Sequence, residues 1–529
     1  MAYDTSSYTS PFWAKSADFV RGRDPLGIQN SSIAVYSLLL PGMTNLTLRM
    51  RYYGFYLWLL DQYHHLPPNS PFKQDLTGQY NFIRRAELIV SYVMVNKFPE
   101  EQSVIGSDFA FRNLTPMPGL AYYDIAKGAD KFKKGKENVY WDFKSGALGQ
   151  YYVGSLMGLQ LVQDSGGYFE RTEKGITLAK AYGQSLSNQT VTLLLKCITT
   201  GKLYLTDIDN LTELSLNKDI TQSDEGKLYL QVLLDNDGTS KRNTSGAIPQ
   251  QRKETLQLFL EYLQEFQEAN SWRKFPLALY SKFLIQNGEI EKEAELGWYY
   301  YYLNELVHFS METIFWGMLS EMEKETYSLT HFIEYISQSV ITYESETFTG
   351  IEKLTVAEVL EKLSTITEKA IEYIDDINAN VKNRETIEGI TNALFFLLKL
   401  YNDNLDNFET LQHYATQYSL FDKNGNALAV FQKYIQNKLQ IAFPDFVKNI
   451  VQTIINEHTA IAYRKMGNGE KNLLKFMLED NHLVHIETMS PNFTSPRLKT
   501  LYNFAIDLGL ITKEGKVTNS GEVVINENA

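Results

Sequence analysis

The apolar residues of this chain recur mainly at three- and four-residue spacing, which is typical of amphipathic helices. Beyond residue 250 the spacing predicts a series of helices, over 253–269, 296–322, 356–378, 384–402 and 427–458. Nearer the N-terminus it predicts shorter helices, over 31–40, 48–64 and 82–95. Pro41-Gly42 and Pro67-Pro68 supply the turns between them. The pattern therefore predicts a mainly α protein.

Local chemistry marks one helix start. Thr355 directly precedes the apolar run that begins at Val356, and Glu358 follows it by three residues. In such a capping box the threonine oxygen accepts a backbone N–H of the first turn, and the glutamate accepts the N–H of the threonine. We therefore expect a helix to begin at Val356.

One stretch without helical spacing marks a boundary. Residues 236–250 hold few apolar side chains and many turn formers. At 529 residues the chain is too long for one hydrophobic core, so several domains are expected. We interpret 236–250 as a linker or a long exposed loop.

Two segments share one succession of elements. The first runs from Gly158 to Gly175 with its glycine turn at Gly166-Gly167, and the second runs from Leu508 to Gly521 with its turn at Gly515. Each reads as a helix, a Gly-Leu stop, a short apolar strand, a glycine turn and a returning strand. Each ends on Thr-x-x-Gly, where the threonine can cap a following helix.

This succession resembles the C-terminal half of winged helix domains, in which a recognition helix precedes a two-stranded wing. The resemblance implies recognition helices over 145–157 and 495–507, and in the family this helix often enters the major groove of DNA. The first has no Lys or Arg, and the second has only Arg497 and Lys499. Because phosphate contacts come largely from cationic groups, protein docking stays open as the role of both modules.

Together these features predict a multidomain helical protein with two small winged-helix-like α+β modules. The predicted parts are a locally basic helical region over 1–130, a winged-helix-like module over 131–235, the linker 236–250, an acidic helical scaffold over 251–460 and a winged-helix-like domain over 461–529.

The charge is unevenly distributed. The chain carries 50 Lys and Arg against 63 Asp and Glu, a net charge of −13. Residues 1–150 hold 16 basic and 13 acidic side chains, so the remainder holds 34 against 50. Any contact with a polyanion is therefore expected in the first third, and the acidic remainder reads as solvated helices.

The sequence favours a cytoplasmic, soluble protein. Cys197 is the only cysteine, and the first 20 residues lack a basic stretch followed by an apolar run, which together indicate a reducing compartment. The best membrane candidate, 296–318, is interrupted by Glu305, His308 and Glu312, so we expect a buried helix of a soluble protein and no membrane partner.

The candidate nucleic-acid-binding residues are cations close to aromatic side chains or in a lysine-rich stretch. Arginine beside aromatics can clamp a single strand, and a lysine loop can contact phosphates without base specificity. The alternative is that the aromatics are core and the lysines only solubilise a loop. Arg84-Arg85 could extend the patch. The predicted set is Arg49, Arg51, Lys127, Lys131, Lys133, Lys134, Lys136, Lys144, Arg497 and Lys499.

Metal-ligand spacing occurs on two predicted helices. Glu305, His308 and Glu312 share one helix face, and Asp61 and His64 repeat the Glu-x-x-His type of spacing. Paired motifs of this kind build di-iron sites in four-helix bundles, but the two further glutamate helices cannot be assigned. A polar stripe or a satisfied core histidine accounts for the pattern more simply. We therefore predict no metal ligand and no cofactor.

Catalytic motifs are lacking. A phosphate-binding Gly-x-x-x-x-Gly-Lys-Ser/Thr and a Gly-x-Ser-x-Gly nucleophile motif are both absent from the sequence. Asp142-Phe-Lys144 could end a metal-dependent nuclease motif, with Asp124 or Asp130 as its upstream acid. The lysine-rich flank does not read as the strand that such a motif needs. No catalytic residue is predicted.

The sequence-based prediction is a non-enzymatic nucleic-acid-binding or adaptor subunit of an intracellular multi-protein system, with protein partners. In general character the chain is similar to accessory proteins of bacterial antiviral defence operons. Two alternatives stay open: a metal-dependent nuclease or other metalloenzyme with dispersed site residues, and a purely structural protein–protein scaffold.

Overall fold

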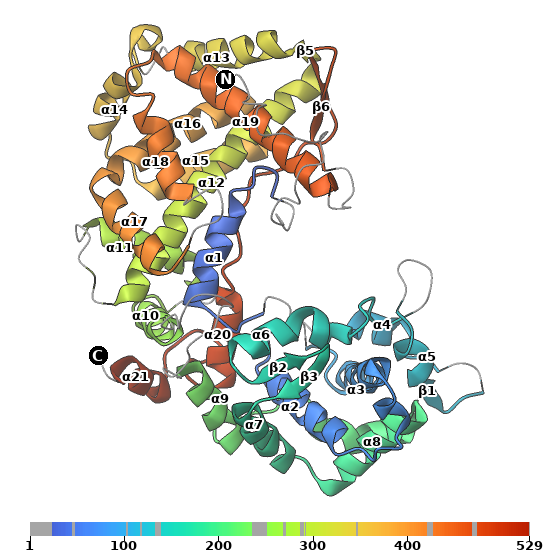
Figure 1. The fold of residues 1–529 in the computed structure, drawn as a ribbon. Helices are drawn as coiled ribbons and strands as arrows, with labels where there is room; N and C mark the ends of the chain where they lie inside the picture. Colours follow the sequence, from blue (N-terminus) through green and yellow to red (C-terminus); the bar gives the residue numbers. More distant parts are fainter. Residues whose placement is uncertain are drawn as a thin grey trace. The chain divides into compact units, whose positions relative to one another are not determined.

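The computed structural model of the protein is mainly helical, which confirms the predicted fold class, and its sheets are small (Figure 1). It describes residues 24–44, 48–101, 104–116, 119–132, 139–234, 251–267, 271–285, 290, 292–344, 348–420, 427–467 and 473–527. The predicted linker 236–250 lies outside the described residues.

The chain forms two compact units, each built from separate stretches of sequence. Unit 1 comprises Met1–Tyr36, Pro276–Glu291 and Glu295–Thr494, and unit 2 comprises Ser37–Phe275, Lys292–Ala294 and Ser495–Ala529. Residues 461–529 are thus shared between the units. The predicted boundaries at residues 130, 235 and 460 stay predictions.

Unit 1 is helical apart from one small sheet. Its elements, some of which begin or end in unit 2, are α1 (Gln29–Leu39), α11 (Phe275–Ile285), α12 (Glu293–Lys324), β5 (Tyr327–Ser328), α13 (Leu329–Glu344), η6 (Ile351–Lys353), α14 (Val356–Ser364), α15 (Ala370–Asn383), α16 (Thr386–Asp403), η7 (Leu405–Asn407), α17 (Phe408–Gln417), α18 (Ala427–Gln436), α19 (Phe443–Gly467), β6 (Phe476–Glu479) and β7 (His482–His485). The three strands form one antiparallel sheet in the order β5-β7-β6.

The central helix of unit 1 is α12. Nearly all of its residues are buried, as expected of a helix that is covered on every side. Gly317 lets α16 approach closely, because a Cβ at this position would lie 2.4 Å from Ile390. On α19, the His458 ring lies 4.7 Å from the ring of Phe315. Because α12 is covered on every side, its polar side chains are also held inside the unit.

Unit 2 combines helices with two strand pairs. Its elements are α2 (Arg51–His64), η2 (Pro71–Lys73), α3 (Leu76–Lys97), α4 (Ser107–Arg112), β1 (Tyr122–Asp124), α5 (Ile125–Ala129), η3 (Leu148–Tyr152, a π-helical turn), α6 (Val153–Gly158), β2 (Val162–Ser165), β3 (Tyr168–Arg171), α7 (Glu173–Gln184), α8 (Asn188–Thr200), β4 (Lys202–Tyr204), η4 (Leu205–Leu214), α9 (Asp224–Leu234), α10 (Arg252–Glu265), η5 (Ser271–Lys274), α20 (Leu498–Asp507) and α21 (Asn519–Asn526). The strands pair antiparallel as β1-β4 and β2-β3.

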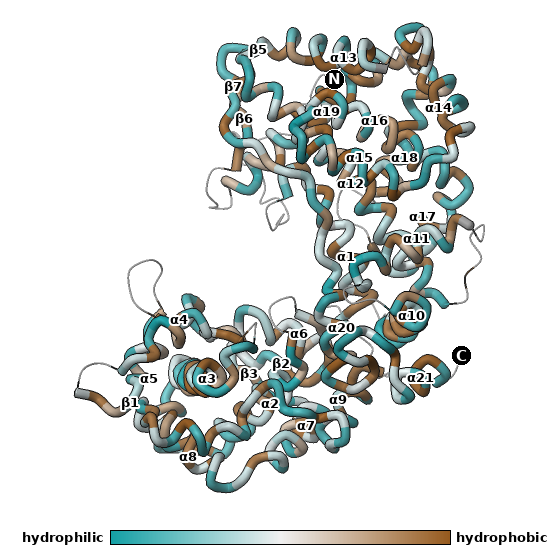
Figure 2. Tube along the Cα trace, turned by 180° about the vertical axis from the view of Figure 1, so that it is seen from behind, coloured by the Kyte–Doolittle hydropathy of each residue, from teal (hydrophilic) through white to brown (hydrophobic). Residues whose placement is uncertain are grey.

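Helix α2 lies in the core of unit 2. All residues from 51 to 60 are buried, including the aromatic run of Tyr52, Tyr53, Phe55, Tyr56 and Trp58. The core interpretation of these aromatics is therefore confirmed. Hydrophilic and hydrophobic residues alternate along many helices of both units (Figure 2), as expected of helices with one face on the core.

Most predicted helices exist with shifted ends, but two are divided, which corrects the prediction. The predicted helix 356–378 is divided into α14, which ends at Ser364, and α15, which begins at Ala370. At the start of α15 the Glu372 carboxylate accepts the N–H of Lys369 at 2.6 Å, which favours a new helix at this point. The predicted helix 427–458 is α18 and α19. Pro444 lies in the first turn of α19, where its missing N–H is tolerated, whereas it would interrupt a continuous helix.

The helix–wing succession is present at both predicted places. In the first, β2 and β3 pair from Val162–Arg171 to Ser165–Tyr168, and Thr172 caps α7 by accepting the N–H of Gly175. In the second, the strands are reduced to one antiparallel bridge between Ile511 and Val517. Thr518 caps α21 in the same manner as Thr172 caps α7. That these modules are winged helix domains stays a prediction.

Helix α12 has the length of a membrane span but carries several buried polar side chains. Across the described ranges, no helix is both long enough and apolar enough to cross a bilayer.

The capping box predicted at Thr355 is confirmed. The Thr355 N–H donates to Glu358 Oε2 at 2.7 Å, and the Glu358 N–H donates to Thr355 Oγ1 at 3.3 Å. We expect Thr355→Ala to lower the free energy of unfolding by about 1 kcal/mol, because an N–H of the first turn loses its acceptor. Urea denaturation measures the change. The control Thr416→Ala, at an exposed position inside α17, should change stability by less; an equal loss in both variants would contradict the cap.

Candidate nucleic-acid interface and a buried histidine–carboxylate cluster

Arg84 of α3 gathers two stretches of unit 2. Its side chain is fully buried, and its guanidinium donates to four main-chain carbonyls. On one side these belong to Ala129 and Lys131, and on the other to Trp141 and Phe143. A buried guanidinium needs an oxygen for every N–H, so these bonds hold the two stretches together.

Exposed cations and rings project from the stretches that Arg84 holds. Lys127, Lys131 and Lys144 are exposed, and so are the rings of Phe132 (38%) and Phe143 (40%). We call these five residues the lysine–phenylalanine surface. Lys133, Lys134 and Lys136, which were also predicted to bind nucleic acid, lie outside the described residues. Of the predicted cations, the structure thus brings Lys127, Lys131 and Lys144 to one region of unit 2.

Glu87, one turn after Arg84 on α3, binds residues on both sides of Phe143 and Lys144 in the sequence. Its carboxylate accepts the hydroxyls of Tyr56 and Tyr140 and the N–H groups of Ala147 and Leu148. Burial raises the pKa of Glu87, although these four donors work in the opposite direction. Arg84 and Glu87 therefore fix both the segment before η3 and η3 itself to α3.

The two predicted arginines of the aromatic run are engaged inside unit 2. Arg51 is 1% exposed, and its guanidinium donates to Ser185 Oγ and to the carbonyl of Ser215. Arg51 Nε also lies 3.5 Å from a carboxylate oxygen of Glu225. Arg49 is partly buried and pairs with Glu101 and Asp507, in both cases at 2.7 Å.

The remaining predicted cations lie on separate elements. Arg497 directly precedes α20 with a left-handed backbone (φ 64°), and Lys499 in α20 is exposed. The other predicted recognition helix, 145–157, is built from η3 and α6. Arg85, next to Arg84, pairs with Asp130 at 2.5 Å, so it does not extend the lysine–phenylalanine surface.

The acidic residues of the nuclease alternative have local partners. Asp124 accepts the N–H of Lys127 at 3.0 Å and caps α5, while Asp130 pairs with Arg85. Asp142 is exposed. Within the described part of the chain, the one group of three potential metal ligands lies in unit 1 instead.

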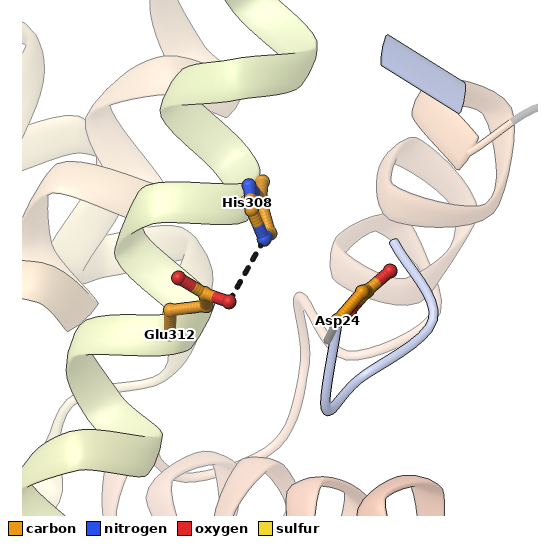
Figure 3. Close-up of side chains that lie close together, drawn as sticks. All are labelled: Asp24, His308 and Glu312. Carbon is orange, nitrogen blue, oxygen red and sulfur yellow. Dashed lines mark ion pairs between the residues drawn. The ribbon is translucent and has the colours of Figure 1, made fainter. Parts of the chain in front are cut away.

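That group consists of Asp24, His308 and Glu312 (Figure 3). His308 and Glu312 lie one turn apart on α12, and Asp24 lies opposite them in the segment before α1. All three are buried, and one ligand atom of each lies within 4.8 Å of the others. His308 Nε2 is 3.1 Å from Glu312 Oε1, whereas Nδ1 faces Glu305 Oε1 at 4.0 Å.

The segment 492–494 orients the two glutamates of α12. The Thr494 N–H donates to Glu305 Oε2 at 2.6 Å, and the Asn492 N–H donates to Glu312 Oε2 at 3.1 Å. In each glutamate the second oxygen, Oε1, is the one that faces His308. Asp24 is fixed by its own turn, where it accepts the N–H groups of Leu26, Gly27 and Gln29.

The cluster contains polar atoms without hydrogen-bond partners. Both ring nitrogens of His308, Oε1 of Glu305 and both amide atoms of Asn304 are buried and form no hydrogen bond. The 3.1 Å approach of His308 to Glu312 therefore has the distance of an ion pair without the direction of a hydrogen bond. Burial lowers the pKa of His308, but Glu312, Glu305 and Asp24 outweigh it and raise this pKa to about 9.

A second buried histidine, His458 of α19, lies beside this cluster and is fully paired. Its Nδ1 lies 3.1 Å from the carbonyl of Pro25, and its Nε2 accepts the N–H of Lys475 at 2.9 Å. This pairing fits a neutral ring with its proton on Nδ1. A cavity of about 270 Å³ opens next to it, lined among others by Asp24, Lys465 and Lys475.

Two features of the candidate sites were not predicted from the sequence. Asp24 is 284 positions from His308 in the chain, and no local pattern connects them. Phe132 and Phe143 flank the lysine-rich stretch, so their aromatic character beside lysines was a usable signal. Asp61, which with His64 repeats the metal-ligand spacing in the sequence, binds Arg171 and lies 3.6 Å from His65.

Searches among protein-family models, curated proteins and solved structures found no match to this chain.

A substitution at Arg51 tests whether this residue stabilises the core of unit 2 or contacts nucleic acid. We expect Arg51→Met to lower the free energy of unfolding by about 3 kcal/mol, because it leaves the carboxylate of Glu225 buried without its cation. Guanidinium denaturation measures this loss, and adding Glu225→Gln to the variant should restore part of it. An Arg51→Met protein of unchanged stability but weaker nucleic-acid binding would instead make Arg51 a contact residue.

His458 provides a pH test. Burial, together with the charges of Lys475 and Lys465, lowers its pKa to about 4. Above pH 6.5 the ring is neutral in both the folded and the unfolded chain. As the pH falls from 6.5 to 4, only the unfolded chain gains the proton, so stability falls by up to about 3 kcal/mol and then levels off.

We expect His458→Gln, whose amide can also donate and accept, to flatten this part of the stability–pH profile measured by denaturation. His413→Ala, at an exposed position on α17, serves as the control and should keep the slope of the wild type. A His458→Gln profile as steep as the wild type would show that other groups carry the acid sensitivity.

Proposed function

We propose that the protein is a non-enzymatic subunit that binds single-stranded nucleic acid through the lysine–phenylalanine surface of unit 2. The observation that carries this proposal is the buried Arg84, which holds exposed lysines and exposed phenylalanine rings in one region. Lysines attract phosphates, and ring faces can stack on unpaired bases.

The chemistry of the surface favours a single strand over a duplex. In a duplex the base faces are covered by their neighbours, so the rings of Phe132 and Phe143 would have nothing to stack on. A solvent-exposed phenylalanine also gains from covering its apolar face. The exposed rings therefore distinguish this surface from a lysine-rich loop that only improves solubility.

The charge distribution supports a local contact. The chain as a whole is acidic, with a net charge of −13, so it would repel a polyanion over most of its surface. Nucleic acid should then approach only where cations exceed acids, which is in the first 150 residues. In this proposal the acidic helices of unit 1 contact protein partners in a larger intracellular assembly, and this contact is the adaptor role of the subunit.

The triple variant Lys127→Ala, Lys131→Ala, Lys144→Ala tests the electrostatic part. We expect weaker binding to single-stranded DNA or RNA, and a dependence of log K on log salt that is shallower by about 2, since each lost phosphate contact removes about 0.7. Fluorescence anisotropy at several salt concentrations measures both quantities. Phe143→Ala should weaken binding with the salt slope unchanged.

The matched control removes three exposed lysines from other elements of unit 2: Lys174, Lys180 and Lys227, each changed to Ala. It alters the net charge equally and should leave the salt slope closer to that of the wild type. Equal effects of both triple variants would indicate a diffuse attraction. No binding by the wild type at low salt would reject the proposal and leave the adaptor alternative.

A further inference from the structure

We propose that Asp24, His308 and Glu312 in unit 1 form a binding site for one divalent transition-metal ion, with Glu305 as the positioning residue for His308. This inference is independent of the nucleic-acid proposal, because it concerns other residues in the other unit. It rests on the ligand types, on their convergence inside the protein and on polar atoms that lack partners.

The convergence of the three side chains is built into the fold. Glu312 and His308 share one face of α12, and the turn before α1 directs Asp24 toward them (Figure 3). The Asn492 N–H holds Glu312 by one oxygen, and the N–H groups of the turn before α1 hold both oxygens of Asp24, which fixes the direction of each carboxylate. Such preorganisation lowers the cost of bringing ligands to an ion.

The two nitrogens of His308 face different carboxylates, an arrangement that suits a metal-binding histidine. Nε2 faces Glu312, which makes it the ligand nitrogen, while Nδ1 faces Glu305. A ligating histidine usually donates its other N–H to a carboxylate, which fixes the tautomer and makes the ligand nitrogen more basic. Glu305 is placed for this role, and its free Oε1 is the oxygen on that side.

The charge and hydrogen bonds of the protein alone leave the cluster incomplete. Three buried carboxylates lie around one imidazole and one buried ammonium group, that of Lys465, which donates to the main-chain carbonyl of Asp24, so the carboxylates outnumber the cationic groups. Buried carboxylates without matching positive charge are costly. A divalent ion would supply that charge, and Asn304, one turn before His308 with both amide atoms unpartnered, could bind a water of the same shell.

The ligand set indicates the class of metal. One imidazole nitrogen with two carboxylates suits Zn²⁺, Fe²⁺ or Mn²⁺, whereas Ca²⁺ and Mg²⁺ prefer oxygen alone. In a tetrahedral shell with bonds of about 2.0–2.2 Å, ligand atoms lie about 3.3–3.6 Å apart. The present separations of up to 4.8 Å would therefore contract on binding, by small movements of the side chains.

A cavity lies on the side of Asp24, although neither His308 nor Glu312 lines it. The cavity of about 270 Å³ is lined by Asp24 and reaches Lys475 and Glu487. Lys475 is paired with Glu487, whose side chain is largely exposed, so the cavity leads toward the surface. An ion could reach Asp24 from solvent without unfolding of α12.

The test uses the full-length protein, stripped with a chelator and titrated with Zn²⁺, Mn²⁺ and the spectroscopic probe Co²⁺. We expect one ion per chain by calorimetry and elemental analysis. Glu305→Gln should weaken binding about 10–100-fold, as loss of an outer-shell partner does, and Glu312→Gln should weaken it further. Both changes keep the side-chain shape and retain an oxygen to accept the N–H groups of Thr494 and Asn492.

The control Glu361→Gln removes an exposed carboxylate from α14 and should bind as the wild type does. Failure of the wild type to bind a stoichiometric ion would overturn the proposal, as would undiminished binding by Glu312→Gln. If Glu312→Gln does not fold, the melting temperature of the wild type decides. It should rise when Zn²⁺ replaces chelator, and an unchanged value would overturn the site.

Discussion

The guanidinium of Arg84 is shut off from water, so each of its N–H groups has to find an oxygen inside unit 2. Carbonyls on both sides of the lysine-rich stretch meet this demand, and the lysine–phenylalanine surface follows from it. Glu87 imposes the complementary demand for donors, which Tyr140 and the start of η3 satisfy. Two buried charged side chains, those of Arg84 and Glu87, thus determine where the exposed residues of the lysine–phenylalanine surface lie.

Buried charge has a second consequence in unit 1. Helix α12 is covered along nearly its whole length, so its polar residues cannot turn to solvent. Glu305 and Glu312 are each satisfied on one oxygen by the 492–494 segment, and the other oxygen is directed at His308. Each nitrogen of the Arg84 guanidinium has a carbonyl partner, whereas neither ring nitrogen of His308 has a hydrogen-bond partner. This difference separates a structural charge from a candidate ligand site.

Local patterns predicted much of the secondary structure. The Thr355–Glu358 box, the Thr-x-x-Gly caps at Thr172 and Thr518, and the aromatic helix α2 all follow from neighbours within four residues. The division of the predicted helix 427–458 was readable from Pro444, and the break before Lys369 depended on a weaker signal, a single glutamate contact. Helix propensity along a run does not reveal where a competing cap begins a new helix.

The sequence by itself determined the helical class, the main helix positions and the caps, because these depend on contacts between residues close in the chain. Only the tertiary structure decided which charged residues are buried and which meet. Arg51 and Lys131 are both cations near aromatics in the sequence, yet one is enclosed against Glu225 and the other is exposed. Asp24 reaches His308 because the fold closes a loop of nearly three hundred residues, and pairing across such a distance leaves no periodic trace in the sequence.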